Sequence, residues 1–320
     1  MNIRRTPSVS VVMPVYNGEA SVEAAIRSVQ GQSLEDWELV IYDDGSRDDS
    51  LAVCRQIAAQ DSRIRVVAGG ANRGLAAAMN RLMDEATAEL IAAQEQDDES
   101  VPDRLAREVE LLASDSKIGM VSGVAEWMSD GEPVTVFPGR LAAGIPYPEA
   151  MVEYLVVEQC KVVNACVMFR RECLPIGRAP FDEEAQTSID WQFFIDVAHH
   201  FRIVGIPEVL VRMDRSPLRD SVTSDKKLQG TEARRCLRVV RQRYRADPES
   251  PVNWRMLRRA WATQLNLEGR WREGARGVPF VALACCLDPL RPELHASLRD
   301  FVRRGLRKAR ATMARRFRTA

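Results

Sequence analysis

Residues 91–105 read Ile-Ala-Ala-Gln-Glu-Gln-Asp-Asp-Glu-Ser-Val-Pro-Asp-Arg-Leu, an apolar run that ends in carboxylates and resumes as a helical pattern after the proline. If the run is a β-strand, its side chains alternate, so Glu95 and Asp97 point to one side and Asp98 to the other. Two convergent carboxylates suit a hard divalent cation, and magnesium is usually held by one or two carboxylates plus the phosphates of a substrate. A solvated acidic loop is the alternative, and the position after a buried strand favours the cation site.

The residues before this stretch alternate between strand-like and helix-like patterns. The predicted strands are residues 9–14, 37–42, 64–67 and 89–93. Short connections between alternating strands and helices predict a parallel sheet with helices on both faces, and such sheets bind ligands outside the carboxyl ends of their strands. Four polar side chains each follow one of these strands: Asn17, Asp44, Asn72 and Asp97. We therefore expect them to converge on one crevice.

Several common sites are excluded by their missing motifs. The first turn, Pro14-Val-Tyr-Asn-Gly18, lacks the G-x-G-x-x-G pattern of dinucleotide-binding enzymes. No Walker loop, G-x-S-x-G elbow or H-E-x-x-H pair occurs. His199 and His200 are adjacent and would face different ways on a helix, so we interpret them as surface or packing residues.

The composition is that of an ordinary globular protein. The chain has 320 residues, of which 46% are hydrophobic and 28% charged. No window approaches the roughly 18 apolar residues of a membrane span, and the first residues lack the hydrophobic region of a signal peptide. Seven cysteines without a Cys-x-x-Cys pair fit reduced thiols better than disulfides or zinc. We expect a cytoplasmic protein.

The carboxyl-terminal part has a different pattern. It is helical throughout, which predicts a division into residues 1–225 and a helical appendage of residues 226–320. Residues 301–320 carry eight Arg/Lys and no acid. Their apolar side chains form one helical stripe, Val302, Leu306, Ala309, Met313 and Phe317. A basic amphipathic helix indicates a peripheral membrane-surface element, and a solvated helix packed on its own domain is the alternative.

Five blocks together resemble the family 2 glycosyltransferases, which have the GT-A fold. Val9-Ser-Val-Val-Met-Pro-Val-Tyr-Asn-Gly18 is similar to the family's opening, and four further blocks follow in the family's order. They are Asp43-Asp44-Gly-Ser46, Asn72-Arg-Gly74 through Asn80, the acidic turn with Pro102-Asp-Arg-Leu105, and the segment around Asp190. Residues 164–171 resemble the strand that passes beneath the acceptor site. The resemblance covers roughly residues 8–225.

The resemblance implies an inverting, non-processive transfer from a nucleotide-sugar donor, typically a UDP-sugar, to a hydroxyl of a sugar or lipid-linked acceptor. Bacterial cell-surface polysaccharide or glycolipid synthesis would be its setting, with no nucleic acid as partner. Asp44 would hydrogen-bond the base, and Asp97, alone or with Asp98, would hold Mg²⁺ or Mn²⁺ on the sugar diphosphate. The residues expected at the nucleotide are Pro14, Val15, Tyr16, Asn17, Asp44, Asn72, Gly74, Glu95 and Gln96.

By the same resemblance Asp190 would be the catalytic base. The family usually has Glu-Asp here, and this chain has Ile189-Asp190. A helix cap formed by Thr187 and Asp190 is the structural alternative, and both roles can hold. A helix amino terminus lowers the basicity of a carboxylate, whereas burial raises it. Lesser candidates for the base are Asp182, Glu183 and Glu184.

Three departures from the family pattern motivate a rival hypothesis. Glu95 replaces an aspartate, Met79 replaces a common arginine, and Ile189 replaces a glutamate. These changes allow a nucleotide-sugar-binding protein without catalysis. A nucleotidyltransferase shares the sheet topology, but it would need a Gly-rich, Arg-containing loop after the first strand, which Pro14–Gly18 does not supply.

Overall fold

The computed structural model describes residues 6–158, 162–215, 226–246, 252–272, 277–300 and 303. They form two compact units, which are described separately. The sheet unit comprises residues 1–151 and 161–222, and the helical unit comprises residues 152–160 and 223–320. The expected boundary after residue 225 falls at the end of a segment outside the described residues. The predicted amphipathic stripe of residues 301–320 also lies outside them, so its contact with a membrane stays a prediction.

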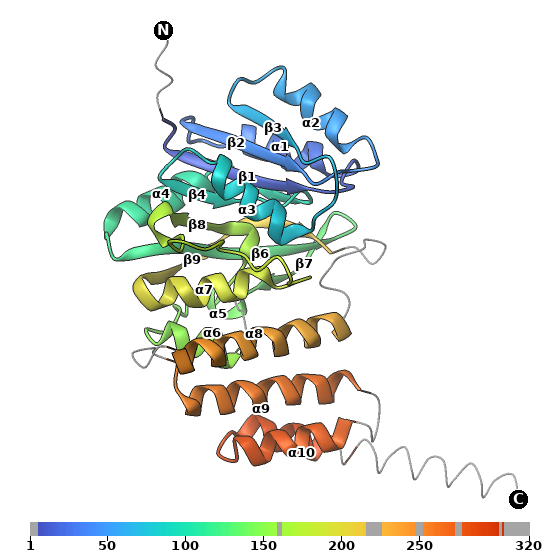
Figure 1. Cartoon of the computed structure of the whole chain (residues 1–320), viewed down its shortest axis with the longest axis vertical. Helices are drawn as coiled ribbons and strands as arrows, with labels where there is room; N and C mark the ends of the chain where they lie inside the picture. The colour runs from blue at the N-terminus through green and yellow to red at the C-terminus, as the bar shows by residue number, and fades with distance from the viewer. Residues whose placement is uncertain are drawn as a thin grey trace, which may run out of the picture. The chain divides into compact units, whose positions relative to one another are not determined.

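The sheet unit is built on one nine-stranded sheet (Figure 1). Its strands are β1 Val9–Val15, β2 Trp37–Asp43, β3 Ile64–Ala68, β4 Leu90–Ala93, β5 Asp98–Ser100, β6 Ile118–Ser129, β7 Glu132–Phe137, β8 Val167–Arg170 and β9 Arg202–Asp214. The order is β3-β2-β1-β4-β8-β6-β9-β5, with β7 paired to β6. The predicted parallel half, β3-β2-β1-β4, is confirmed. The other half is mixed, because β8 runs antiparallel to both β4 and β6.

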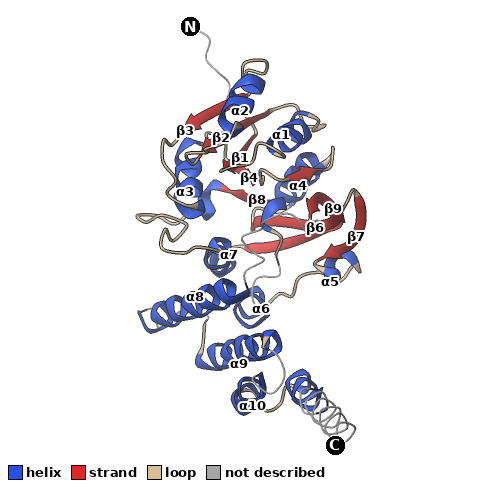
Figure 2. Cartoon of the chain, turned by 90° about the vertical axis from the view of Figure 1, so that its right-hand side faces the viewer, coloured by secondary structure: helices blue, strands red, loops and turns tan. Residues whose placement is uncertain are grey.

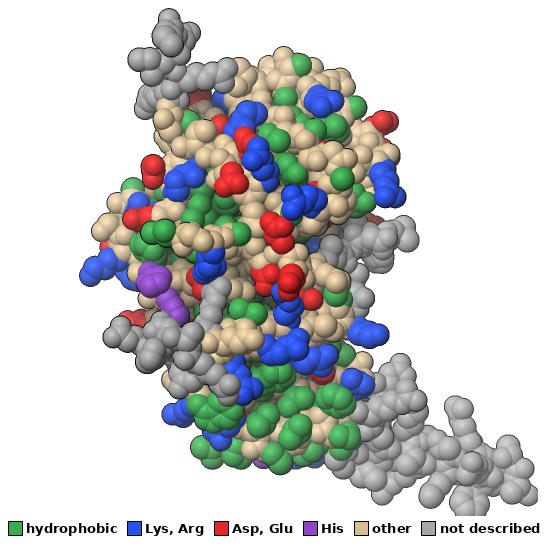
Figure 3. All heavy atoms as spheres, in the orientation of Figure 1, with side chains coloured by type: hydrophobic (Ala, Val, Ile, Leu, Met, Phe, Trp, Pro, Cys, Tyr) green, Lys and Arg blue, Asp and Glu red, His purple; other side chains and the backbone are tan. Residues whose placement is uncertain are grey.

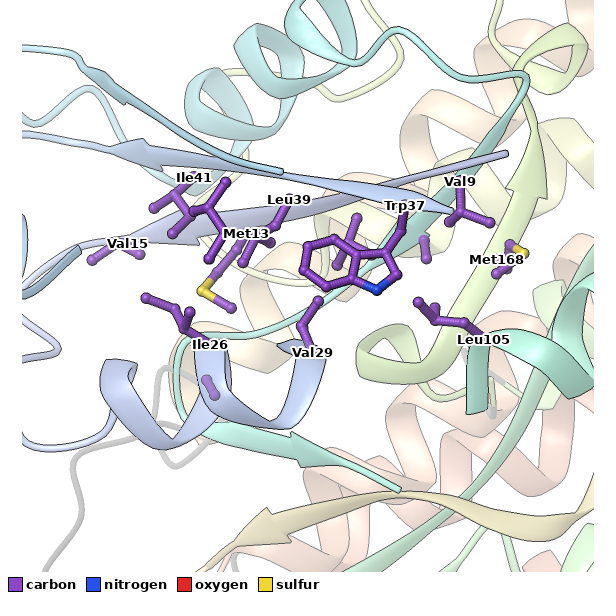
Figure 4. Close-up of a cluster of buried hydrophobic side chains, with 14 of the residues drawn as sticks. Val9, Met13, Val15, Ile26, Val29, Trp37, Leu39, Ile41, Leu105 and Met168 are labelled. Atoms are coloured by element: carbon purple, nitrogen blue, oxygen red, sulfur yellow. The ribbon is translucent and has the colours of Figure 1, made fainter. Parts of the chain in front are cut away.

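Helices cover both faces of the sheet, as predicted (Figure 2). The helices of this unit are α1 Val22–Gln30, α2 Ser50–Ala58, α3 Leu75–Glu85, α4 Arg104–Ser114, α5 Gly139–Ala142 and α7 Ile189–His200. Two 3-10 turns, η1 Asn164–Cys166 and η2 Arg171–Cys173, flank β8. Helices α1, α2 and α4 pack on one face through an apolar core that includes Met13, Ile26 and Trp37 (Figure 4). Strands buried on both faces explain the continuous apolar runs of β1 and β2.

The helical unit contains α8 Lys226–Ala246, α9 Trp254–Trp271 and α10 Val278–Leu287. It also includes most of α6 Met151–Glu158, and residues 292–300 are helical. Two ion pairs join α6 to the rest of this unit: Arg259 binds Glu153, and Arg291 binds Glu158 at 2.7 Å. No helix of the described residues is both long and apolar enough to cross a membrane.

The acidic stretch is not the continuous strand that the alternation argument assumed. Strand β4 ends at Ala93, residues 96 and 97 form a turn, and β5 begins at Asp98. The backbone N–H of Asp98 donates to the carbonyl of Glu95 at 3.4 Å and closes this turn. The directions of the carboxylates are therefore set by a turn and by contacts across loops.

Candidate active site

The first two loops at the carboxyl edge of the sheet are joined by hydrogen bonds. Asn17 has a φ of 49°, a left-handed conformation that asparagine tolerates better than most residues. Its backbone N–H donates to Ser46 Oγ at 3.0 Å, and its side-chain oxygen accepts from the N–H of Arg47 at 2.9 Å. The N–H of Gly18 donates to Ser50 Oγ at 2.7 Å. The predicted nucleotide-lining turn after β1 is thus held against the loop after β2.

Asp44 joins the second loop to the third. Its side chain is only 3% exposed, and its carboxylate accepts from the backbone N–H groups of Arg73, at 3.0 Å, and Gly74, at 2.8 Å. Gly45 has a φ of +75°, and a β-carbon there would lie 2.7 Å from the backbone of Ala71, so the close approach of these loops requires glycine. The predicted base-binding carboxylate therefore also positions the Asn72–Gly74 loop, on which Asn72 itself is exposed.

Gln96 connects the acidic turn to the first loop. Its Oε1 accepts from the N–H of Tyr16 at 2.9 Å, and its Nε2 donates to the carbonyl of Tyr16 at 3.2 Å. A β-carbon on Gly18 would lie 2.5 Å from Gln96 Oε1. Gln96 thus holds the backbone of the turn after β1. Val15, another predicted nucleotide residue, is buried, and its carbonyl accepts from the N–H of Asp44.

Three carboxylates predicted to act in one site lie within electrostatic reach of one another. Burial of the Glu95 carboxyl group, followed by the negative charge of Asp97, raises the pKa of Glu95 to about 7. A hydrogen bond of 3.0 Å from Asn164 Nδ2 lowers this pKa, the charge of Asp190 raises it, and the charge of Arg215 lowers it. Asp190 at the amino terminus of α7 therefore lies near enough to the acidic turn for its charge to act on Glu95, although almost 100 residues separate them in sequence.

Asp190 lies in the first turn of α7, and the alternative interpretation of Thr187 and Asp190 as the helix cap is wrong. The helix is capped by Ser188, not Thr187, and the Ser188 side chain makes no capping hydrogen bond. Ser188 has a φ of 54°, an unfavourable conformation for serine that is common beside functional sites. Thr187 is buried. The structure therefore does not show a cap formed by Thr187 and Asp190.

Of the lesser candidates for the base, Glu183 contacts α3 and the loop before it. Asn80 Nδ2 donates to Glu183 Oε1 at 3.2 Å and to the carbonyl of Phe181 at 2.9 Å. Arg73 forms an ion pair with Glu183 at 3.5 Å. Asp182 accepts from the N–H of Glu184 at 3.1 Å. This segment therefore fixes the loop before α7 against the third loop.

The three departures from the family pattern differ in their surroundings. Met79 and Ile189 are 4% and 6% exposed, so both apolar replacements belong to the core. Glu95 instead lies in the acidic cluster, where Asn164 meets its longer side chain. Two polar residues of this cluster were missed from the sequence, Asn164 and Arg215. Asn164 stands at the head of a segment that resembled the acceptor-site strand, but Arg215 carried no signal beyond following a strand.

A fully buried arginine, Arg104, holds the acidic turn through hydrogen bonds to the residues around it. Arg104 donates to Gln94 Oε1 at 3.2 Å, to Ser100 Oγ at 2.9 Å and to the carbonyl of Ala93 at 2.7 Å. Gln94 Nε2 in turn donates to the carbonyls of Asp98 and Glu95, at 2.7 and 3.1 Å. Both ends of the turn are thus fixed through one guanidinium, whose charge is balanced by the buried Glu108 at 3.2 Å.

We predict that Arg104→Met destabilises the fold by about 3–5 kcal/mol, because Glu108 would remain as an uncompensated buried charge. Urea unfolding measures this loss, and Arg104→Met with Glu108→Leu should recover much of it.

Burial already raises the pKa of Glu108 from 4.5 to about 7. The folded state therefore keeps the Glu108 proton to a higher pH than the unfolded state does. The free energy of unfolding falls as the pH rises between these two pKa values. Without Arg104 the pKa rises further, so the destabilisation should be larger at high pH than at low pH. A loss that is equal at both ends of this range would contradict the prediction.

The cluster suits a cation that has further ligands of its own. Among the described residues, no group of three or more His, Cys, Asp or Glu side chains is placed to hold a metal by itself. Asp97 and Glu95 offer carboxylate oxygens, and their mutual repulsion, visible in the raised pKa of Glu95, would be relieved by a divalent ion. Asp98 is only 2% exposed, so it is less accessible than Asp97. An oxygen-only set fits Mg²⁺ or Mn²⁺ when a diphosphate completes the coordination.

Comparisons with known proteins agree on the class of domain. Residues 10–143 match the family described as "Glycosyl transferase family 2". EpsE of Bacillus subtilis (strain 168) is 36% identical over 149 residues, which cover 44% of this chain and 54% of EpsE. The Escherichia coli protein named UDP-Glc:alpha-D-GlcNAc-diphosphoundecaprenol beta-1,3-glucosyltransferase WfgD is 31% identical over 173 residues, covering 54% of this chain and 64% of WfgD. The chain thus spans between half and two thirds of these relatives.

The fold recurs in a solved structure. The mannosyltransferase PcManGT from Pyrobaculum calidifontis, in complex with GDP-Man and Mn²⁺, superposes with a TM-score of 0.56 at 18% identity. The match covers 95% of this chain and 88% of that one. At this identity the likeness concerns the fold alone.

Proposed function

The chain belongs to the family 2 glycosyltransferases and has their predicted GT-A fold, and from this premise we propose that it transfers a sugar from a nucleotide sugar to an acceptor hydroxyl. The setting would be bacterial cell-surface polysaccharide or glycolipid synthesis, as the names of its relatives suggest. The observation that supports the proposal is that the charges of Asp97 and Asp190 both raise the pKa of Glu95, while Gln96 in the same turn is hydrogen-bonded to the loop after β1.

The proposed donor is a UDP-sugar. WfgD is named for UDP-Glc, which supports uracil as the base, whereas the same fold in PcManGT takes GDP-Man. The base would lie beside Asp44, and the turn of residues 14–17 would line the nucleotide. The acceptor is proposed to be a sugar on a lipid diphosphate, because that chemistry appears in the name of WfgD.

Asp97, with Glu95 beside it, is the proposed holder of the cation, and Asp98 is left as a buried residue of β5. When bound, Mg²⁺ or Mn²⁺ neutralises negative charge that develops on the leaving diphosphate. The protein's own part is to fix these carboxylates. Gln96 holds the turn to Tyr16, and Arg104 holds its two ends through Gln94.

Asp190 is the proposed general base. The acceptor oxygen forms a bond to the anomeric carbon while the bond from that carbon to the diphosphate breaks, and Asp190 takes the hydroxyl proton. Attack from the side opposite the diphosphate inverts the configuration. Asp190 suits this role because it is partly exposed, lies close enough to Glu95 to affect its pKa, and comes from an element other than the donor-binding loops.

A screen of nucleotide sugars by thermal stabilisation, with Mn²⁺ present, tests the donor class. A ligand at 100 times its dissociation constant adds about 2.7 kcal/mol to stability. We expect UDP-sugars to raise the melting temperature more than GDP-sugars. Stabilisation by donors followed by no release of nucleoside diphosphate, even with lipid-linked acceptors, would favour the non-catalytic binding protein. Stabilisation by none of them would contradict the proposal.

We predict that Asp44→Ala weakens UDP binding by about 1–3 kcal/mol, the cost of an unmade buried hydrogen bond. The substitution removes the acceptor for the base and also releases the N–H groups of Arg73 and Gly74, so the third loop should loosen. Calorimetry with UDP measures the affinity. Asp49→Ala is the matched control, since it removes an exposed carboxylate from the same connection. Unchanged UDP affinity in Asp44→Ala would remove this residue from the site.

A further inference from the structure

Helix α10 has no polar side chain, yet only one of its faces is buried against other residues that the structure describes. Its sequence is Val-Pro-Phe-Val-Ala-Leu-Ala-Cys-Cys-Leu. Val281, Ala284 and Cys285 are buried, and the last two belong to a core that the helix shares with Ala262 of α9 and Leu294. A helix that is apolar all round is normally buried all round. The exposed side of α10 therefore calls for a partner.

The exposed side of the helix and the turn after it carry apolar side chains, which we call the α10 face. It consists of Pro279, Leu283, Cys286 and Leu290. The first three have the i, i+4, i+7 spacing that aligns side chains on one side of a helix. Leu290 lies in the non-helical turn after α10 ends at Leu287. Leu283 is 51% exposed and Leu290 is 88% exposed. Hydrophobic side chains gather over α10 in the surface view (Figure 3). Contiguous exposed apolar side chains of this kind mark interaction sites.

The charge of this part of the chain indicates the chemistry of the partner. Residues 226–320 contain 24 Arg/Lys and 8 Asp/Glu, a net charge of +16. The first 225 residues contain the remaining 21 basic and 37 acidic side chains, a net charge of −16. The zero net charge of the chain thus conceals a strongly basic carboxyl-terminal part, which would attract an anionic surface.

Exposed arginines also lie at the margin of the α10 face. The guanidinium carbon of Arg272 is 4.2 Å from the ring centroid of Phe280, in the first turns of α10. Arg272 and Arg270 are both exposed at the end of α9. By contrast, Arg259 and Arg291 are engaged with acids inside the helical unit. Apolar side chains flanked by exposed guanidinium groups match the boundary between acyl chains and phosphate headgroups.

We propose that the α10 face binds the surface of an anionic lipid membrane. Its leucines would enter the headgroup–acyl boundary while the arginines at its margin contact lipid phosphates. A second copy of the chain suits this face less well, because two copies of residues 226–320, each with a net charge of +16, would repel one another. The proposal is independent of the transfer reaction, although it would bring the protein to a membrane that contains a lipid-linked acceptor.

The test is flotation of the full-length protein with vesicles of phosphatidylcholine alone and of phosphatidylcholine mixed with phosphatidylglycerol. We expect binding to the mixed vesicles, reduced at high salt. The double variant Leu283→Glu/Leu290→Glu should bind at least about tenfold more weakly, because its carboxylates replace two inserting leucines and oppose the anionic lipid. Ile176→Glu is the matched control, since Ile176 is fully exposed on the sheet unit, and it should bind like the wild type.

Three results would overturn the proposal. They are a wild-type protein that ignores mixed vesicles, a double variant that binds them as well as the wild type, and wild-type dimers that Leu283→Glu/Leu290→Glu converts to monomers in sedimentation experiments. The last result would assign the α10 face to a second copy. Two controls detect loss of the fold. The single variant Leu290→Glu changes only a residue in a turn, and the melting temperature of each variant should equal that of the wild type. The assay contains no donor or acceptor, so its outcome does not depend on whether the protein transfers sugar.

Discussion

Replacement of Asp190 by asparagine should slow sugar transfer by about 10²–10⁴-fold, the usual contribution of a general base. Nucleotide binding should remain nearly normal, because Asp190 lies on α7 and not on the loops that follow β1, β2 and β3. Asparagine keeps the size of the side chain, so the substitution removes the charge of Asp190 and leaves its packing nearly unchanged. The measurement is the rate of transfer beside the affinity for UDP with Mn²⁺.

Asp196→Asn is the matched control for this experiment. It makes the same substitution on the same helix, where Asp196 is paired with Arg178 at 2.6 Å, and it should transfer sugar at close to the wild-type rate. A matching loss of thermal stability in Asp190→Asn would indicate a structural role. If Asp190→Asn transfers sugar at the wild-type rate, the base lies elsewhere, and residues 182–184 become the next candidates.

Asp97→Ala should lose Mn²⁺-dependent nucleotide binding and transfer together. Charge stabilisation by a bound cation is worth several kcal/mol, so the loss of transfer should be about 10³-fold. Unlike Asp190, this residue would act through the diphosphate in both the ground state and the transition state. Calorimetry with UDP, with and without Mn²⁺, distinguishes the loss of cation-dependent binding expected for Asp97→Ala from the nearly normal binding expected for Asp190→Asn.

Glu99→Ala is the control for Asp97→Ala, because it removes an exposed carboxylate two residues further along the same stretch. It should keep both the binding and the transfer. Nucleotide binding that is equally tight with and without Mn²⁺ in the wild type would contradict the assignment of a cation to Asp97. Retention of Mn²⁺-dependent binding by Asp97→Ala would place the cation on other ligands.

The parallel half of the sheet could be predicted, and with it the edge proposed to carry the site, because its signals are local. Continuous apolar runs marked β1, β2 and β4, and the polar residue after each strand identified the edge. The alternation argument for residues 95–98 was wrong because alternation holds only within a strand, and here the strand ends at Ala93. The predicted carboxylates nevertheless come close together, because a turn and Gln96 position them.

The remaining details depend on partners far away in sequence, which leave no local pattern. Gln96 pairs with the backbone of Tyr16, 80 residues earlier, and Asn164 reaches Glu95 from 69 residues away. The second hydrogen-bonding role of Asp44 depends on the third loop. The place of helix α6 in the helical unit could not be predicted for the same reason, because its ion pairs with Arg259 and Arg291 join it to residues more than 100 positions later.

The most direct test measures release of UDP from a panel of UDP-sugars, with a lipid-linked sugar acceptor, by the wild type and Asp190→Asn. Each protein is assayed with Mn²⁺ and with EDTA. We expect the wild type to release UDP from at least one donor with Mn²⁺ and to stop in EDTA. Asp190→Asn should bind the same donor and release UDP about 10²–10⁴-fold more slowly. Tight donor binding by the wild type without release of UDP, or equal release by both proteins, would contradict an enzyme in which Asp97 and Asp190 act at one site.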